Sequence, residues 1–436
     1  MPVDASAFYP ADPKAAAHAL NPLAATMEGS RILGIAYQVS AMQAEGQEVC
    51  NLTVGDFDPS SFNAPVALRA RIAELTLAGH TNYPPADGVP VLRQAIADFY
   101  AERLGVRFPM ASVVVGSGAR PPLYAALRCL LAPGDVYLYA LPSWNNNYYT
   151  HLNGAKAVTV PTRAEDGFMP TAADLRPHLP QARVLHLNSP LNPCGTVIQA
   201  DVLAEICQDI VAENRRREGT GQKPLFLIYD MVYWLLTYGD ATHADPVALV
   251  PEIAPHVIYI DAISKWLAAT GLRVGWGVVP AYLQPKFKAL IGHMGSWAPR
   301  PEQMATAWLL RETRVLDGFL DELRGDVRAR LELIHRSFSR MTDEGLPVEA
   351  IEPQGAIYLS IRVNLIGRSL PDGTPITTNE QIRNYLLTES RVAVVPFQAF
   401  GLEDETGWFR MSVGAVALDE LSDALDRLEV AVRKLL

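Results

Sequence analysis

The sequence predicts an α/β protein in which a large domain, built on a mostly parallel sheet flanked by helices, is followed by a smaller α/β domain. Between residues 113 and 279, short runs rich in β-branched residues alternate with segments of helical periodicity. Helical periodicity dominates from about residue 301 to 341, and a shorter set of strand and helix patterns follows. With 436 residues, the chain is long enough for two or three domains.

Composition excludes several classes of partner. A net charge of −10 argues against a nucleic-acid or anionic-membrane partner, because both need a basic face. We find neither a secretory signal pattern at the start nor an apolar run of about 18 residues that could cross a membrane. The four cysteines are far apart and lack metal-ligand spacing, so we expect reduced thiols in a cytoplasmic protein and no metal site.

The first hundred residues predict an arm and two helices. Residues 1–29 are rich in Ala and Pro, which indicates a loosely structured lead-in. Ser30 predicts the N-cap of a helix that runs to about Glu45. Residues 51–59, which include Gly55, predict a turn-rich loop after a short strand. A second helix, with apolar residues at helical spacing, follows Gly88.

The segment after the strand at 113–116 predicts an anion site. It reads Ser117-Gly-Ala-Arg120, and two prolines follow that suit the first turn of a helix. Backbone N–H groups at a helix N-terminus bind phosphate because they are unpaired and lie at the positive end of the helix dipole. Gly118 lets the backbone approach such a ligand closely.

Four further strands are expected at 136–140, 184–188, 225–229 and 257–260. Each is followed by residues that could carry chemistry, because open α/β sheets place their sites at the carboxyl ends of strands. These residues are Trp144, Asn192, Asp230 and Lys265. A carboxylate such as Asp230, at the end of an apolar strand, needs a partner because burial of an unpaired charge is costly. The charged stretch 213–218 predicts a solvated helix face or loop.

The segment Ser264-Lys265, followed by Gly271-Leu-Arg273-Val-Gly275, resembles the Schiff-base lysine segment of pyridoxal-phosphate enzymes of the aminotransferase class I/II family. Six motifs occur in the family's order between about residues 30 and 436. Besides the lysine segment they include Pro142-Ser-Trp144, Asn192-Pro-Cys-Gly195, Asp230-Met-Val-Tyr233 and Trp408-Phe-Arg410-Met-Ser412. The resemblance implies the aspartate aminotransferase fold, with a seven-stranded sheet in the large domain and pyridoxal 5′-phosphate as cofactor.

The resemblance also implies roles at the reacting centre. Lys265 would bind the cofactor covalently and then move a proton as general acid and base. Asp230 would pair with the ring nitrogen of the cofactor, and Tyr233 and Asn192 would hydrogen-bond its phenolic oxygen. Trp144 would stack on the ring.

The cofactor phosphate is implied to lie at the predicted anion site. The residues expected around it are Ser117, Gly118, Ala119, Arg120, Ser264 and Arg273, together with Tyr83 of a neighbouring subunit. The expected assembly is therefore a homodimer in which Tyr83 crosses the interface. The implied domain boundaries are 1–29 for the arm, 30–50 for an N-terminal helical segment, 51–310 for the cofactor-binding domain and 311–436 for the small domain.

The implied substrates are an amino acid and a 2-oxo acid, between which the enzyme moves an amino group by a ping-pong Schiff-base mechanism. Arg410 would bind the α-carboxylate through its forked guanidinium, close to Gly55 and Asn192. Met294 falls where one branch of the family carries a second arginine, which disfavours aspartate or glutamate as the preferred donor.

Departures from the family pattern leave alternatives open. Ala262 replaces a serine that contacts the phosphate, and Phe397 occupies a glycine position, where we expect its ring to reshape the wall beside the substrate. A lyase or a cyclopropane-forming synthase could use the same scaffold, and product analysis separates these reactions from transamination. A non-catalytic binding protein is the remote alternative, which activity that depends on Lys265 would exclude.

Overall fold

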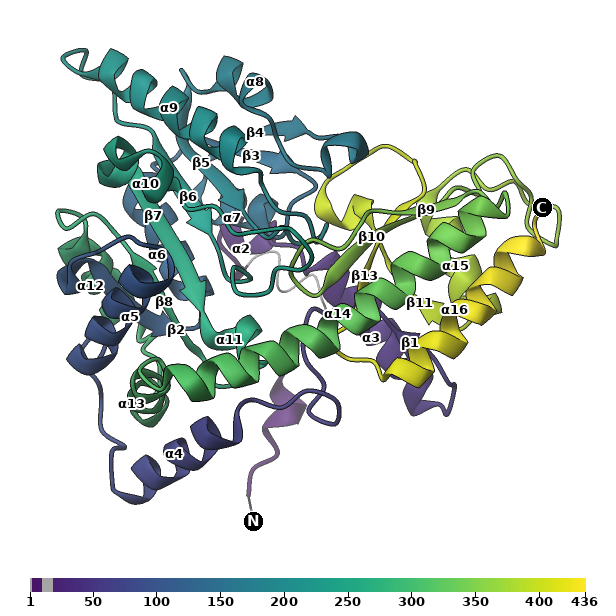
Figure 1. Ribbon diagram of the computed structural model, residues 1–436, viewed down its shortest axis with the longest axis horizontal. Coiled ribbons are helices and arrows are strands. Elements are labelled where there is room, and N and C mark those ends of the chain that lie inside the picture. Colours follow the sequence, from purple (N-terminus) through teal and green to yellow (C-terminus); the bar gives the residue numbers. More distant parts are fainter. Residues whose placement is uncertain (1, 10–18) are drawn as a thin grey trace.

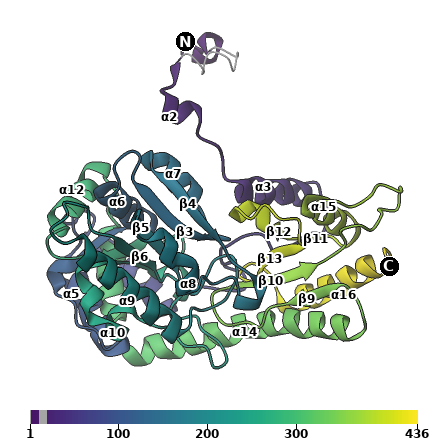
Figure 2. The same cartoon turned by 90° about the horizontal axis from the view of Figure 1, so that it is seen from above.

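The computed structural model describes residues 2–9 and 19–436 (Figure 1). Residues 1 and 10–18 of the predicted arm lie outside the described residues. The rest of that arm carries two single turns, η1 (Ala5–Phe8) and α2 (Pro22–Ala25), and extends away from the body of the protein in Figure 2. In the described part of the chain, no helix has both the length and the apolar character needed to cross a membrane.

The larger sheet has seven strands in the order β2-β8-β7-β6-β5-β3-β4. Four neighbouring pairs are parallel, and β8 runs antiparallel to both of its neighbours. The fold predicted from the sequence is therefore confirmed. The strands are β2 (Val113–Ser117), β3 (Val136–Leu141), β4 (Lys156–Pro161), β5 (Ala182–Asn188), β6 (Phe226–Asp230), β7 (Val257–Ala262) and β8 (Val274–Val278).

Helices cover both faces of this sheet. Apolar side chains of α6 (Arg120–Leu130), α7 (Asn146–Asn153) and α12 (Gln284–Met294) pack on one face. On the other face lie α5 (Pro90–Arg103) and α9 (Ala200–Arg217). The shorter or peripheral helices are α4 (Val66–Leu77), α8 (Ala172–Leu175), α10 (Pro246–Leu249), α11 (Ile263–Trp266) and α13 (Arg300–Leu309). Both faces of the sheet are thus buried, which accounts for its nearly continuous apolar strands.

A second unit contains an antiparallel sheet in the order β12-β13-β10-β9. Its elements are β9 (Val348–Ala350), β10 (Tyr358–Val363), β12 (Val395–Pro396), β13 (Trp408–Ser412), α15 (Asn379–Glu389) and α16 (Leu418–Arg433). The 31-residue helix α14 (Thr313–Asp343) runs along both units (Figure 1). The early strand β1 (Cys50–Asn51) pairs with β11 (Val392–Ala393), and α3 (Arg31–Ala44) packs beside them.

Local sequence patterns explain most element boundaries. Ser30 caps α3 and Thr378 caps α15 through its side chain. The continuous helical segment expected near residues 301–341 is instead two helices, because the chain turns between α13 and α14. The expectation of a solvated 213–218 stretch is wrong for Arg217, which is buried and donates hydrogen bonds to Glu213 and to the carbonyl of Ala182.

Candidate active site

A cleft of about 530 Å³ lies where the carboxyl edge of the large sheet meets the small sheet. It brings together most of the site residues predicted from the sequence. Those that line it are Gly55, Ala119, Arg120, Trp144, Asn192, Asp230, Tyr233, Ser264, Lys265, Arg273 and Arg410. Ser117 and Gly118 lie directly behind Arg273, which contacts both.

Lys265 reaches the cleft from α11, the single helical turn that follows β7. Its Nζ donates a hydrogen bond to the carbonyl of Gly55 at 2.5 Å and lies 5.8 Å from the centre of the Tyr233 ring. No carboxylate pairs with this amine among the residues that the structure describes. The amine is therefore held by one neutral acceptor and remains open to a ligand.

Asp230 is the last residue of β6 and is buried. Within the described chain its carboxyl accepts a single, long hydrogen bond, 3.3 Å, from the backbone N–H of Val232. Burial raises the pKa of this carboxyl to about 7, against the lowering effect of the Val232 N–H. A cation placed next to Asp230 would restore the ionised form.

The opposite end of the cleft is positively charged. The guanidinium of Arg273 donates to the carbonyls of Thr270 (2.7 Å) and Ser117 (3.1 Å). A side chain at position 118 would collide with this guanidinium, so Gly118, at φ +81°, is needed here. Arg120, at the start of α6, lies 4.6 Å from the centre of the Trp144 ring. Within the described chain neither arginine has a carboxylate partner, so this end is suited to an anion.

Arg410 lies in β13 with 1% of its surface exposed. It donates to Asn192 Oδ1 at 3.0 Å and to the carbonyl of Thr53 at 2.5 Å, while its Nε has no partner among the described residues. The rings of Tyr358 and Phe400 lie 4.6 and 5.0 Å from the guanidinium carbon. A buried guanidinium without a carboxylate leaves its charge available to a carboxylate ligand.

Tyr358 is a cleft residue that the sequence analysis missed. Its hydroxyl lies 2.8 Å from that of Tyr233 and 3.4 Å from Asn192 Nδ2. Tyr358 lies at the start of β10, and Ser360, two residues later, pairs with Arg410 of β13. This pairing places the Tyr358 ring over the Arg410 guanidinium. The sequence indicated only a strand here, and the one available signal was the Gly355 turn that precedes it.

Two residues singled out in the sequence do not line the cleft of this chain. Phe397 does not line the cleft; it is 1% exposed and packs against Phe168, Phe400 and Trp408. The expectation that its ring reshapes the wall beside the substrate is not met by direct contact, because the ring turns into an aromatic cluster. Tyr83 lies outside the cleft of its own chain, 80% exposed and edge-on to Trp297.

The unpartnered groups fit pyridoxal phosphate. The buried Asp230 lacks a cation, which a protonated ring nitrogen would supply. The glycine-containing turn and the two arginines at the other end suit a phosphate. Lys265 lies in the same cleft, and Arg410 remains for a carboxylate.

Comparisons with known proteins give the same answer. A family model described as aminotransferase class I and II matches residues 47–428. The aspartate aminotransferase of Rhizobium meliloti is 28% identical over 409 residues, which cover 93% of this chain and 94% of that protein. The arginine–pyruvate transaminase of Pseudomonas aeruginosa is 29% identical over 418 residues, with coverages of 94% and 96%. The crystal structure of the R. meliloti aspartate aminotransferase matches with a TM-score of 0.86 at 26% identity, covering 96% of this chain and 99% of that one.

The fold and the cleft thus define a pyridoxal-phosphate-dependent enzyme of the aspartate aminotransferase type. The chain belongs to the aminotransferase class I and II family, and it is a transaminase that uses pyridoxal phosphate.

Proposed function

We propose that Lys265, Asp230 and Arg410 carry the transamination, with an α-amino acid and a 2-oxo acid bound alternately in the cleft. The observation that carries this proposal is that the three groups converge on one cleft and that none has a partner of opposite charge among the described residues. When bound, pyridoxal phosphate supplies an electron sink for the electron pair released at the Cα of the amino acid.

Lys265 is the proposed covalent attachment point and the group that moves the proton from Cα. Its Nζ, held by the Gly55 carbonyl, lies beside the Tyr233 ring at the edge of the sheet. Asp230 would keep the cofactor ring nitrogen protonated by charge pairing. Tyr233 and Asn192, which both contact Tyr358, hold the phenolic oxygen, and Trp144 covers the ring.

The phosphate is assigned to the positive end of the cleft. The residues proposed to hold it are Ser117, Gly118, Ala119, Arg120, Ser264 and Arg273. Support comes from the contacts of Arg273 with the 117–118 turn and from the absence of a carboxylate partner for either arginine within the described chain. Ala262 offers no hydroxyl here, so this end relies more on Arg273.

Arg410 is proposed to bind the α-carboxylate of the substrate, next to Asn192 and Gly55. The relatives are named for aspartate, for aspartate and prephenate, and for arginine with pyruvate. We therefore propose an amino-acid:2-oxo-acid exchange and test donors of the acidic, basic and aromatic classes. Each must carry an α-carboxylate, because the forked guanidinium is the only proposed anchor common to all three.

We further propose a cytoplasmic homodimer in which Tyr83 reaches the phosphate of the partner chain. Its ring is 80% exposed and lies outside its own cleft, which suits a contact with a second copy. The cytoplasmic assignment is supported by the four cysteines, all present as free thiols. We also propose domain boundaries at residues 29, 50 and 310; the one at 50 is supported by the packing of α3 and β1 against β11 and α15 of the small unit.

Borohydride reduction followed by peptide mapping tests the attachment point. Reduction converts a lysine-bound cofactor into a stable adduct, which we expect on the peptide that contains Lys265. Turnover with a panel of donors and 2-oxo acids is then compared for wild type and Lys265→Ala. An adduct on another lysine, or equal turnover by Lys265→Ala, would contradict the assignment.

A further inference from the structure

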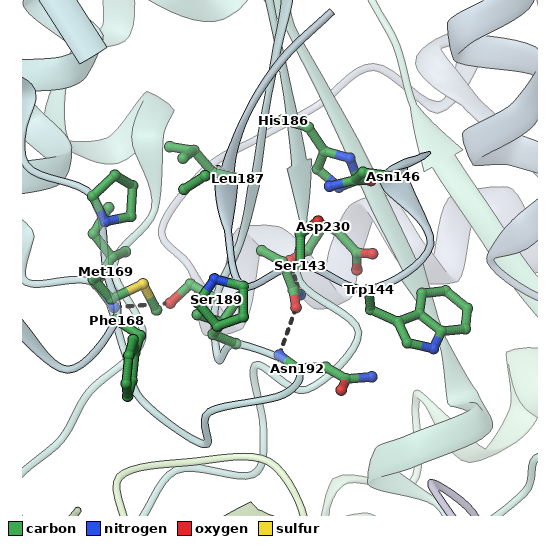
Figure 3. Close-up of a pocket in the computed structure, with 16 residues that line it drawn as sticks. Ser143, Trp144, Asn146, Phe168, Met169, His186, Leu187, Ser189, Asn192 and Asp230 are labelled. Carbon is green, nitrogen blue, oxygen red and sulfur yellow. Dashed lines mark hydrogen bonds between the residues drawn. The ribbon is translucent and has the colours of Figure 1, made fainter. Parts of the chain in front are cut away.

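A second, smaller cavity of about 40 Å³ adjoins the cleft at the carboxyl ends of β3, β5 and β6 and shares Trp144, Asn188, Asn192 and Asp230 with it. Its walls include His186, Asn146, Trp144 and Asp230 (Figure 3). His186 has no role in the proposed chemistry, yet it is buried and its Nε2 has no hydrogen-bond partner among the described residues. An unpaired polar atom in an enclosed space is costly unless a ligand or water satisfies it.

The sheet register fixes how His186 lies relative to Asp230. In the parallel pair β5–β6, Asn188 is opposite Asp230 and His186 is opposite Ile228. His186 and Asp230 therefore point to the same face, offset by two residues, which is roughly 7 Å along the strands. No hydrogen bond joins the two side chains within the described chain, and one bridging water molecule could connect them.

A neighbouring tyrosine sets the tautomer of His186. The Tyr137 hydroxyl donates to Asn146 Oδ1 at 3.0 Å and lies 2.6 Å from His186 Nδ1. The hydroxyl has a single hydrogen, which it donates to Asn146. In the 2.6 Å contact, Nδ1 is therefore the donor and the hydroxyl oxygen is the acceptor. The imidazole is neutral, since burial lowers the pKa of His186 to about 3. Nε2 then carries a lone pair and can only accept a hydrogen bond.

We propose that His186 is a positioning residue that holds one water molecule in this cavity, oriented so that it donates one hydrogen to Nε2 and the other to the carboxylate of Asp230. The cavity exceeds the roughly 10–15 Å³ that one water needs, and its walls carry the two to four polar partners that an ordered water requires. The donated hydrogen bond stabilises the ionised carboxylate and aims it at the cleft. This inference rests on the proposed pairing of Asp230 with the cofactor ring nitrogen.

The test measures cofactor affinity and does not depend on turnover. The cofactor-free full chain is titrated with pyridoxal phosphate and with its deaza analogue, in which a C–H group replaces the ring nitrogen. Wild type is expected to bind pyridoxal phosphate more tightly than the analogue. In His186→Leu the affinity for pyridoxal phosphate is expected to fall about tenfold, while that for the analogue is unchanged, because one hydrogen bond to a charged group is lost.

Two further variants serve as controls. His186→Gln, whose amide oxygen reaches the place of Nε2, is expected to restore most of the affinity for pyridoxal phosphate. Tyr137→Phe removes the group that fixes the tautomer and is expected to lower the same affinity without changing that of the analogue. Thermal unfolding of the cofactor-free variants checks that each is folded. If His186→Leu does not fold, Tyr137→Phe still tests the proposal.

The outcomes separate this inference from the assignment on which it rests. A wild-type chain that binds both compounds equally would overturn the pairing of Asp230 with the ring nitrogen. If wild type discriminates but His186→Leu weakens both compounds equally, or weakens neither, the pairing stands and the role given to His186 is overturned.

Discussion

Two buried aspartates at the ends of neighbouring strands show how differently this sheet uses the same residue type. Asp230 ends β6 and Asp261 lies near the end of β7, and the register of the two strands places them on opposite faces. Burial raises the pKa of each carboxyl to about 7. The Asp261 carboxyl accepts hydrogen bonds from Tyr100, Trp234, Trp266 and the backbone N–H of Ala262, whereas the Asp230 carboxyl accepts one within the described chain, from Val232.

The difference separates a structural carboxylate from the one that we propose to be functional. Asp261 ties Trp234, in the turn after Asp230, to Trp266, next to Lys265, so it fixes the two turns that carry the site. Its partners are all supplied by the chain. Asp230 lacks such partners, which leaves its charge for the cofactor. The number of internal partners, rather than burial or pKa, distinguishes the two roles.

The largest expected effect is that of Asp230→Ala on activity. Loss of a buried charge partner costs about 3–5 kcal/mol, so kcat/KM should fall by about 10²- to 10⁴-fold. The cofactor-free protein should unfold at the same or a higher temperature, because a buried carboxyl without a cation is removed. Steady-state kinetics and thermal unfolding measure both effects. A marked loss of stability in this variant would place Asp230 with the structural carboxylates.

Asp261→Ala should show the converse pattern. Removing the carboxyl leaves buried donors of Tyr100, Trp234 and Trp266 without an acceptor, at about 1–3 kcal/mol each, so the free energy of unfolding should fall by about 3 kcal/mol or more. Urea denaturation of the cofactor-free protein measures this loss. Turnover per folded, cofactor-loaded site should stay close to wild type, and a loss as large as that of Asp230→Ala would remove the distinction.

The pH dependence of stability sharpens the comparison further. Because the folded-state pKa of Asp230 is raised, its contribution is fully present below the unfolded pKa, about 3.9, and is lost as pH rises through about 7. Between those limits the unfolding free energy of cofactor-free wild type should fall relative to Asp230→Asn, by at most about 1.4 kcal/mol per pH unit.

Urea denaturation at several pH values within that window measures the difference between the two proteins. Saturating pyridoxal phosphate should abolish the pH-dependent loss in wild type, since the ring nitrogen then pairs with the carboxylate. Parallel curves for the two cofactor-free proteins across the whole window would show that Asp230 is not an unpaired carboxyl.

Tyr358→Phe should have the smallest effect. It removes the hydroxyl shared with Tyr233 and Asn192 but keeps the ring that lies on Arg410. Loss of one hydrogen bond of about 0.5–1.5 kcal/mol should change kcat/KM by roughly two- to tenfold. A shift in the visible absorbance of the bound cofactor should accompany it, because we propose that Tyr233 contacts the phenolic oxygen. An unchanged spectrum and rate would show that the Tyr358 hydroxyl has no role in the chemistry of the cleft.

Local pattern was enough to predict most strands of the large sheet and the loops that carry Lys265, Asp230 and Asn192, but not β4 or α12. Those residues follow apolar strands directly, and parallel strands place their carboxyl ends on one edge. Sequence pattern could not separate Asp230 from Asp261, since each follows a short apolar run and the difference lies in side chains supplied by distant segments.

The remaining misses have the same origin. Tyr358 joins the cleft only because β10 pairs with β13, and Arg217 is buried only because the carbonyl of Ala182 faces it across the core. The ring of Phe397 turns away from the cleft because Phe168 and Trp408 form an apolar pocket for it. Each depends on tertiary contacts that single-segment periodicity does not contain.

The central claim is that this cleft converts an amino-acid donor to its 2-oxo acid, the first half of a transamination, when no 2-oxo acid acceptor is present. The direct measurement mixes the cofactor-loaded protein with an amino acid, without a 2-oxo acid, and follows both the visible absorbance and the released products. The account predicts that the band of the lysine-bound cofactor disappears while one equivalent of the matching 2-oxo acid forms per site, and that a second 2-oxo acid restores it. Continuous release of ammonia or thiol without an acceptor would contradict it.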